Sequence, residues 1–136
     1  MKTILKIISI LSCVAVVSAT DIELIQYSDL RLRNSSTNSL FRTWTLQGKP
    51  EITITFEQKQ VYGSDGCNRY SSPVLIKDNC IKFSAIMATR ANCENLNGSD
   101  SAFRRTLIAV ESYRITDKGL LELLGESGNV LLTFHR

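Results

Sequence analysis

The sequence predicts a β-rich α+β domain, in which about eight short antiparallel strands form a curved sheet or partly open barrel packed with one helix. Short segments with strand-like periodicity recur between turn-forming residues along most of the chain. One stretch changes instead to the period of a helix. The strand faces and the helix would bury their apolar side chains against one another.

The clearest strand signal is EITITFE, at residues 51–57. Ile52, Ile54 and Phe56 alternate with threonines, which is the period-two pattern of a half-buried strand. Shortly before it, Trp44 lies in the segment TWTLQ. We expect Trp44 to anchor the core, because a large aromatic side chain buries much apolar area.

Turn residues mark the later strands. PVLIKDNCIKFSAI, at residues 73–86, predicts two strands around the turn Lys77-Asp78-Asn79. The segments SYRIT, LLELL and VLLTF are separated by glycine-containing turns. They predict an antiparallel meander that ends the domain.

The helix is predicted between Asp100 and Tyr113. Phe103, Leu107 and Val110 fall at i, i+4 and i+7, on one helical face. Ser99 or Asp100 would cap its start by bonding amide groups that have no partner inside the helix. Three charged side chains are expected mostly toward solvent: Arg104, Arg105 and Glu111.

The first 19 residues have the pattern of a secretory signal peptide, with a charged start, an apolar stretch and the small-residue site Val17-Ser18-Ala19. A lipoprotein with acylated Cys13 is the disfavoured alternative, because the apolar run continues beyond this cysteine. Cleavage near Ala19 would make the protein secreted or periplasmic. It would leave an N-terminal extension at residues 20–40 and a domain at residues 41–136.

Cleavage would remove Lys2 and Lys6 from the 16 basic residues, leaving 14 against 13 acidic ones, a net charge of +1. The mature chain has no basic block of the kind that binds nucleic acid or anchors a protein to membranes. We therefore expect no nucleic-acid partner and no strong membrane association.

Three cysteines would remain after cleavage: Cys67, Cys80 and Cys93. In an oxidising compartment one pair should form a disulfide, and the spacing leaves all three pairings open. A zinc site made by these cysteines and His135 is disfavoured, because structural zinc sites usually contain closely spaced ligand pairs. No metal and no other cofactor is expected.

No catalytic residue is expected either. His135, the only histidine, is one residue from the end of the sequence and has no evident partner for a Cys–His nucleophile pair. Asp65, Asp78 and Glu94 would act as acids or bases only if folding clustered them. Isolated surface carboxylates are far more common.

The segment GSDGCNRYSS, at residues 63–72, predicts a constrained loop. Gly63 and Gly66 can take positive φ, so the backbone can turn or bulge sharply. Asn68 can hydrogen-bond neighbouring backbone groups, and Cys67 is placed to tie the loop to a distant segment.

With these segments in order, the chain resembles the META/HslJ family of small secreted or envelope proteins over residues 41–136. The matching features are an opening tryptophan segment, a GCN-R-aromatic loop, and a T-R-x-x-C segment followed by a helix. The residues expected to form this structural motif are Trp44, Gly63, Gly66, Asn68, Arg69, Tyr70, Thr89 and Arg90. Cys80 is not part of the family pattern, and residues 20–40 are not placed by it.

The resemblance implies a small β-rich fold without established catalytic activity, associated with stress responses, antibiotic tolerance or virulence. The family-like motifs place Cys67 and Cys93 in two irregular loops, which predicts a disulfide between them. Cys80 would stay unpaired and pack as a small apolar residue in its strand.

The expected function is that of a non-enzymatic, monomeric binding protein related to stress or virulence. Its unknown partner would be a protein or an apolar ligand, contacted through the sheet surface or the loops around Cys67 and Cys93. A lipid carrier needs a cavity lined by strand residues. The alternative, a disulfide-stapled inhibitor of a secreted hydrolase, needs a protruding, ordered loop and a filled core.

Overall fold

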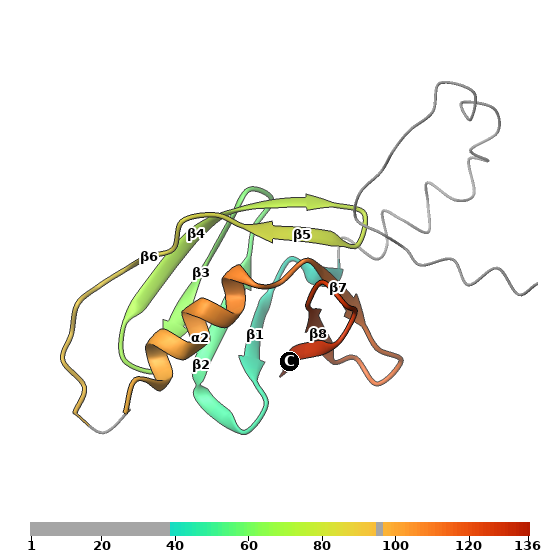
Figure 1. The fold of residues 1–136 in the computed structure, drawn as a ribbon. Coiled ribbons are helices and arrows are strands. Elements are labelled where there is room, and N and C mark those ends of the chain that lie inside the picture. Colours follow the sequence, from blue (N-terminus) through green and yellow to red (C-terminus); the bar gives the residue numbers. More distant parts are fainter. Residues whose placement is uncertain (1–38, 95–96) are drawn as a thin grey trace, which may run out of the picture.

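The computed structural model describes residues 39–94 and 97–136, so the predicted signal peptide and nearly all of the predicted extension lie outside the described residues. Nine strands and the helix α2 lie within them (Figure 1). Their bounds are β1 (Thr43–Leu46), β2 (Lys49–Phe56), β3 (Gln60–Asp65), β4 (Arg69–Lys77), β5 (Cys80–Phe83), β6 (Met87–Ala88), α2 (Ser99–Ile108), β7 (Ser112–Ile115), β8 (Leu121–Leu124) and β9 (Val130–His135). No helix in the described ranges is long and apolar enough to cross a membrane.

Eight of these strands close into an antiparallel barrel. Their order is β3-β2-β1-β9-β8-β7-β5-β4, and β4 pairs with β3 to complete the ring. The ninth strand, β6, pairs with Tyr70 and Ser71 of β4. On the same strand, β5 pairs with the later residues, from Val74 to Lys77. The expectation of a partly open barrel is therefore wrong, because β3–β4 pairing gives the strands at both ends of the sheet a partner.

The barrel wall has two narrow seams. β5 and β7 meet through a single residue pair, Cys80 with Ser112. β1 and β9 meet through two pairs, Thr45 with His135 and Leu46 with Phe134. Ladders this short add few backbone hydrogen bonds, so closure depends on side chains that pack inside the ring.

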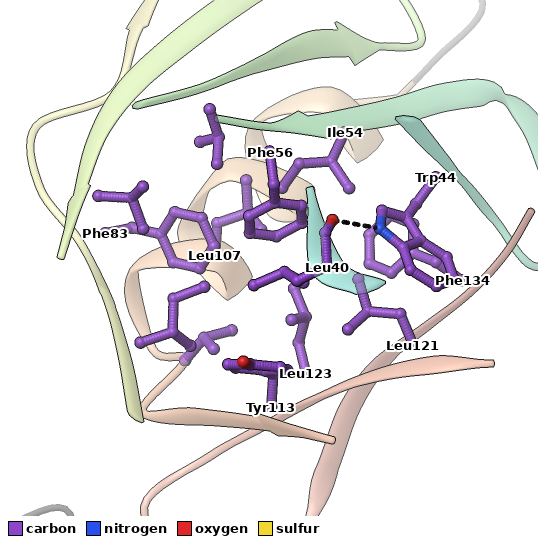
Figure 2. Close-up of a cluster of buried hydrophobic side chains, with 14 of the residues drawn as sticks. Leu40, Trp44, Ile54, Phe56, Phe83, Leu107, Tyr113, Leu121, Leu123 and Phe134 are labelled. Carbon is purple, nitrogen blue, oxygen red and sulfur yellow. Dashed lines mark hydrogen bonds between the residues drawn. The ribbon is translucent and has the colours of Figure 1, made fainter. Parts of the chain in front are cut away.

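Apolar side chains fill the barrel interior (Figure 2). Trp44 is fully buried beside Phe134, and its indole N–H donates a hydrogen bond of 3.0 Å to the backbone oxygen of Leu40. The predicted alternation in β2 is confirmed, since Ile52, Ile54 and Phe56 are all buried. The other buried members of this cluster are Leu40, Val61, Tyr70, Val74, Ile81, Phe83, Phe103, Leu107, Val110, Tyr113, Leu121, Leu123 and Phe134.

The helix α2 packs Phe103 and Leu107 into this core and contacts β3 and β5. It is shorter than predicted, because the chain leaves the helix at Ala109 to enter β7. The predicted capping is also wrong. Gly98, in the left-handed conformation with φ 77°, occupies the N-cap position, and no side chain caps the helix there.

Candidate functional site

A buried carboxylate organises the loop between β3 and β4. Asp65 is fully buried, and its Oδ1 accepts hydrogen bonds from the backbone N–H groups of Cys67, at 3.0 Å, and Asn68, at 2.6 Å. Gly66, between Asp65 and Cys67, has φ 96°, a left-handed conformation that side chains disfavour. Asp65 is thus the centre of a tight turn, and the expectation of an isolated surface carboxylate is wrong.

The same carboxylate connects the loop to the helix. Arg104 of α2 donates from Nη1 to Oδ2 of Asp65, and it also lies 3.7 Å from Asp100. Arg104 was expected mostly toward solvent, but only 24% of its side chain is exposed. The helix face that packs against β3 brings this arginine over the buried acid, which would otherwise be an unpaired charge.

Asn68 holds a second segment against the loop. It is buried, and its Oδ1 accepts hydrogen bonds from Oγ1 of Thr89, at 3.0 Å, and from the N–H of Ala91, at 2.7 Å. Thr89 is also joined to β4, since its N–H donates to the backbone oxygen of Arg69 at 2.9 Å. These bonds fix the chain on both sides of Arg90.

As predicted, a disulfide joins Cys67 to Cys93. Their two Cα atoms lie 5.9 Å apart. Residues 65–68 and 89–93, hereafter the tied loops, are therefore held by one covalent bond and by the Asn68 hydrogen bonds. The expectation of an unpaired Cys80 is wrong, because Cys80 is also disulfide-bonded. Ile81 and Phe83 take the buried positions of β5, so Cys80 does not pack in the core.

Tyr70 lies beside the tied loops and is fixed by contacts to β2 and α2. Its hydroxyl donates a hydrogen bond of 2.9 Å to the backbone oxygen of Thr53, and its ring meets Phe103 edge-on at 5.7 Å. Burial raises the pKa of the Tyr70 hydroxyl far above its ordinary value, and the charge of Asp65 raises it further. Tyr70 therefore remains a neutral hydrogen-bond donor.

Gly63 is needed for a different reason from the one expected. It does not have positive φ. A Cβ at this position would lie 2.1 Å from the backbone oxygen of Thr53, the same oxygen that Tyr70 binds. Only glycine lets β2 and β3 approach so closely beneath Tyr70.

The structure brings most of the predicted motif together. Gly63, Gly66, Asn68, Arg69, Tyr70 and Thr89 all lie at or beside the tied loops. Trp44 belongs to the barrel core. Arg90 is exposed, and within the described residues no hydrogen bond or ion pair engages its guanidinium.

Among the described residues, Cys67, Cys93 and His135 do not come together as a zinc or nucleophile site. The sulfurs of Cys67 and Cys93 form a disulfide, so neither is a thiolate for catalysis or zinc binding. His135 is exposed, and its Nδ1 lies 2.9 Å from the backbone oxygen of Arg136. Within residues 39–94 and 97–136, no three His, Cys, Asp or Glu side chains are grouped to hold a metal ion.

A shallow, open depression of about 440 Å³ lies between the β1–β2 turn and β9. Leu46, Leu131 and Leu132 contribute its apolar surface, and each also packs against the barrel core. Lys49 lies on its border. The depression is a surface feature and leaves the packed interior of the barrel intact.

Sequence reasoning missed Asp65 and Arg104, the pair that ties the loop to the helix. The Asp65-Gly66-Cys67-Asn68 order did contain a local signal, because aspartate often accepts hydrogen bonds from the N–H groups two and three residues later. No local signal marked Arg104, which is 39 residues away along the chain.

Comparison with known proteins identifies the fold and the family. A family model described as META domain matches residues 23–136. A search of the curated proteins found no match. Two solved structures have a similar fold, both determined by NMR. One, a protein from Burkholderia xenovorans, has a TM-score of 0.60 and 23% identity, covering 76% of this chain and 87% of its own. The second has a TM-score of 0.53 and 22% identity, covering 71% and 89%.

Proposed function

The chain belongs to the META-domain family, and from that premise we propose that it is a non-enzymatic, exported binding protein with a role in stress or virulence. Its partner is a protein, bound through the tied loops. The family is not known for catalysis. The observation that carries the proposal is the double restraint on residues 89–93, which presents an exposed surface in one conformation.

The physical advantage of such a surface is preorganisation. Residues 89–94 are all exposed, and in Figure 1 the chain after β6 stands out from the barrel. A free loop loses conformational entropy when it binds, whereas a loop already fixed by a disulfide and hydrogen bonds loses less. The filled barrel interior favours surface binding over internal transport of a lipid.

Site-specific photo-crosslinking tests this proposal. A photoreactive residue at Asn92, in the tied loops, should form a defined protein adduct in the native host. The matched control is the same residue at Lys118, an exposed position in the β7–β8 turn. Adducts that form equally at both positions, or that persist with excess unlabelled protein, would contradict binding through the tied loops.

Export is tested separately, by the intact mass of protein purified from its native host. The expected mature chain begins at Thr20 and is not acylated. A chain that retains its first 19 residues, or that begins with lipid-modified Cys13, would contradict this part of the proposal.

The depression beside β9 favours a second candidate, the binding of an apolar ligand. Its volume falls within the range typical of small-molecule sites, and three leucines contribute to its surface. A fluorescent fatty acid should then bind with a one-to-one stoichiometry, and Leu132→Asp should weaken it. Unchanged fluorescence on titration with the wild-type protein would exclude this candidate.

A further inference from the structure

Arg90 occupies a special position in the tied loops. The residue before it, Thr89, is held by the Asn68 side chain and by β4. The N–H of the residue after it, Ala91, is held by the same Asn68 oxygen at 2.7 Å. Arg90 itself is exposed, and its guanidinium has no partner among the described residues.

The segment is also held at its far end, by Cys93. Thr89 and Cys93 both turn their side chains toward the β3–β4 loop, where they meet Asn68 and Cys67. Arg90 and Asn92 lie between these anchored positions, and both are exposed.

We propose that segment 89–93 is an inhibitory loop for trypsin-like serine proteases, with Arg90 as the side chain that enters the specificity pocket. Such proteases carry a carboxylate at the base of that pocket, which binds arginine or lysine. An exposed guanidinium that has no partner among the described residues, on a preorganised segment, is complementary in charge to this pocket. The inference rests on the proposed function, because it names the class of protein that the tied loops bind.

The covalent step explains why the loop would inhibit the protease and not simply be cut. The protease serine Oγ attacks the Arg90 carbonyl carbon, the bond to the Ala91 nitrogen breaks, and the serine proton passes through the protease histidine to that nitrogen. The products are an ester on the serine and a new amine at Ala91. The reverse attack of this amine on the ester restores the peptide bond and returns the proton to Oγ.

The structure favours the reverse step. After cleavage, the Ala91 amine remains bonded to Asn68, and the Cys67–Cys93 disulfide retains the chain that follows. On the other side, Thr89 remains bonded to Asn68 and to β4. The new ends therefore stay within reach of each other, at a high effective concentration. The Asn68 oxygen bridges the two sides of the cleaved bond.

Inhibition of trypsin by the oxidised protein tests the inference. We expect reversible, one-to-one inhibition, measured with a chromogenic arginine substrate. Arg90→Ala should raise the inhibition constant by at least about thirtyfold, the scale of one interface hot spot. Arg90→Lys should retain inhibition, and Arg90→Leu should abolish it. The matched control is Arg105→Ala, which removes another exposed arginine, on α2.

The role of Asn68 is tested by mass spectrometry of the same mixtures. Asn68→Ala should turn the inhibitor into a substrate cut after Arg90. Because Asn68 is buried, circular dichroism must first show that this variant folds. Thr89→Val is a second variant that keeps Asn68 and removes the Thr89 hydroxyl, which donates to the Asn68 oxygen and accepts from the Arg69 N–H.

Three results would overturn the inference: no inhibition by the wild-type protein, rapid wild-type cleavage with recovery of trypsin activity, or inhibition unchanged by Arg90→Ala. The proposed function is tested by different results from those that test the protease class. A crosslinked partner at Asn92 without inhibition of trypsin would refute the protease class alone, whereas equal crosslinking at Asn92 and Lys118 would refute binding through the tied loops.

Discussion

The barrel core and the tied loops are held together by different forces. Around Trp44, the chain is stabilised by apolar side chains that come from every part of the ring, with short ladders at two seams. The tied loops are held instead by the buried Asp65 carboxylate, the buried Asn68 amide and the Cys67–Cys93 disulfide. Few residues there contribute apolar packing.

These two kinds of interaction have different roles in the protein. Hydrophobic burial is non-directional, so it makes the barrel form without fixing any atom closely. Hydrogen bonds to a charged group and disulfides have narrow geometry. The core therefore decides whether the protein folds, and the tied loops decide where the exposed backbone at residues 89–93 lies. Substitutions in the two regions should have different effects.

The largest loss of stability is expected from Trp44→Ala. Removing a fully buried indole should lower the free energy of unfolding by about 4–5 kcal/mol, the upper part of the usual range for such changes. Urea unfolding should show this as a fall in the midpoint of the whole transition. Trp44→Phe, the control, keeps most of the apolar area and should lose much less. Equal losses in the two variants would contradict a packing role.

Asp65→Ala should have the next largest effect, about 3–4 kcal/mol. It leaves the Arg104 guanidinium without its buried partner and frees two backbone N–H groups of the turn. The matched control is Asp100→Ala, because Asp100 lies near the same arginine but is partly exposed. Its loss should be under about 0.5 kcal/mol. If both variants unfold at the same urea concentration, the turn is not organised by Asp65.

Replacing Cys67 and Cys93 together by serine should destabilise the protein by about 3 kcal/mol, through a less restricted unfolded chain. The effect on the folded state should be local. Amide hydrogen exchange should accelerate at residues 89–93 and remain slow in β2 and β8. Faster exchange throughout the barrel would show that the two regions are not separable.

The smallest effect is expected from Tyr70→Phe, about 1 kcal/mol. The ring and its contact with Phe103 remain, and only the hydrogen bond to the Thr53 oxygen is lost. Thermal unfolding measures this change. A loss as large as that of Asp65→Ala would mean that the Tyr70 hydroxyl also positions the tied loops.

Local patterns in the sequence predicted the strands and the helix face well. Alternation identified β2, turn residues identified the β4–β5 hairpin and the strands β7 to β9, and the helical period placed Phe103 and Leu107 in the core. Barrel closure was not predictable in this way, because periodicity does not say which strands are neighbours. The helix end was also missed, since Val110 is buried after the helix has ended.

The tied loops were predictable only in part. The resemblance to a known family predicted the Cys67–Cys93 disulfide, which spacing alone left open. The Asp65–Arg104 pair was out of reach, because a charged residue on a helix looks the same in sequence whether it meets solvent or a distant buried acid. Cys80 was misjudged, since an apolar segment was taken to mean an apolar position.

The place of β9 in the ring has a consequence for the order of folding. The first and the last strands of the barrel in chain order, β1 and β9, are neighbours, and β9 also pairs with β8. During synthesis, which proceeds from the N-terminus, the ring cannot close until β9 has emerged. The residues that hold the tied loops together lie between Asp65 and Arg104 in the chain, so they emerge earlier than β9. The Cys67–Cys93 disulfide can thus form while the sheet is still open, before β9 closes the barrel.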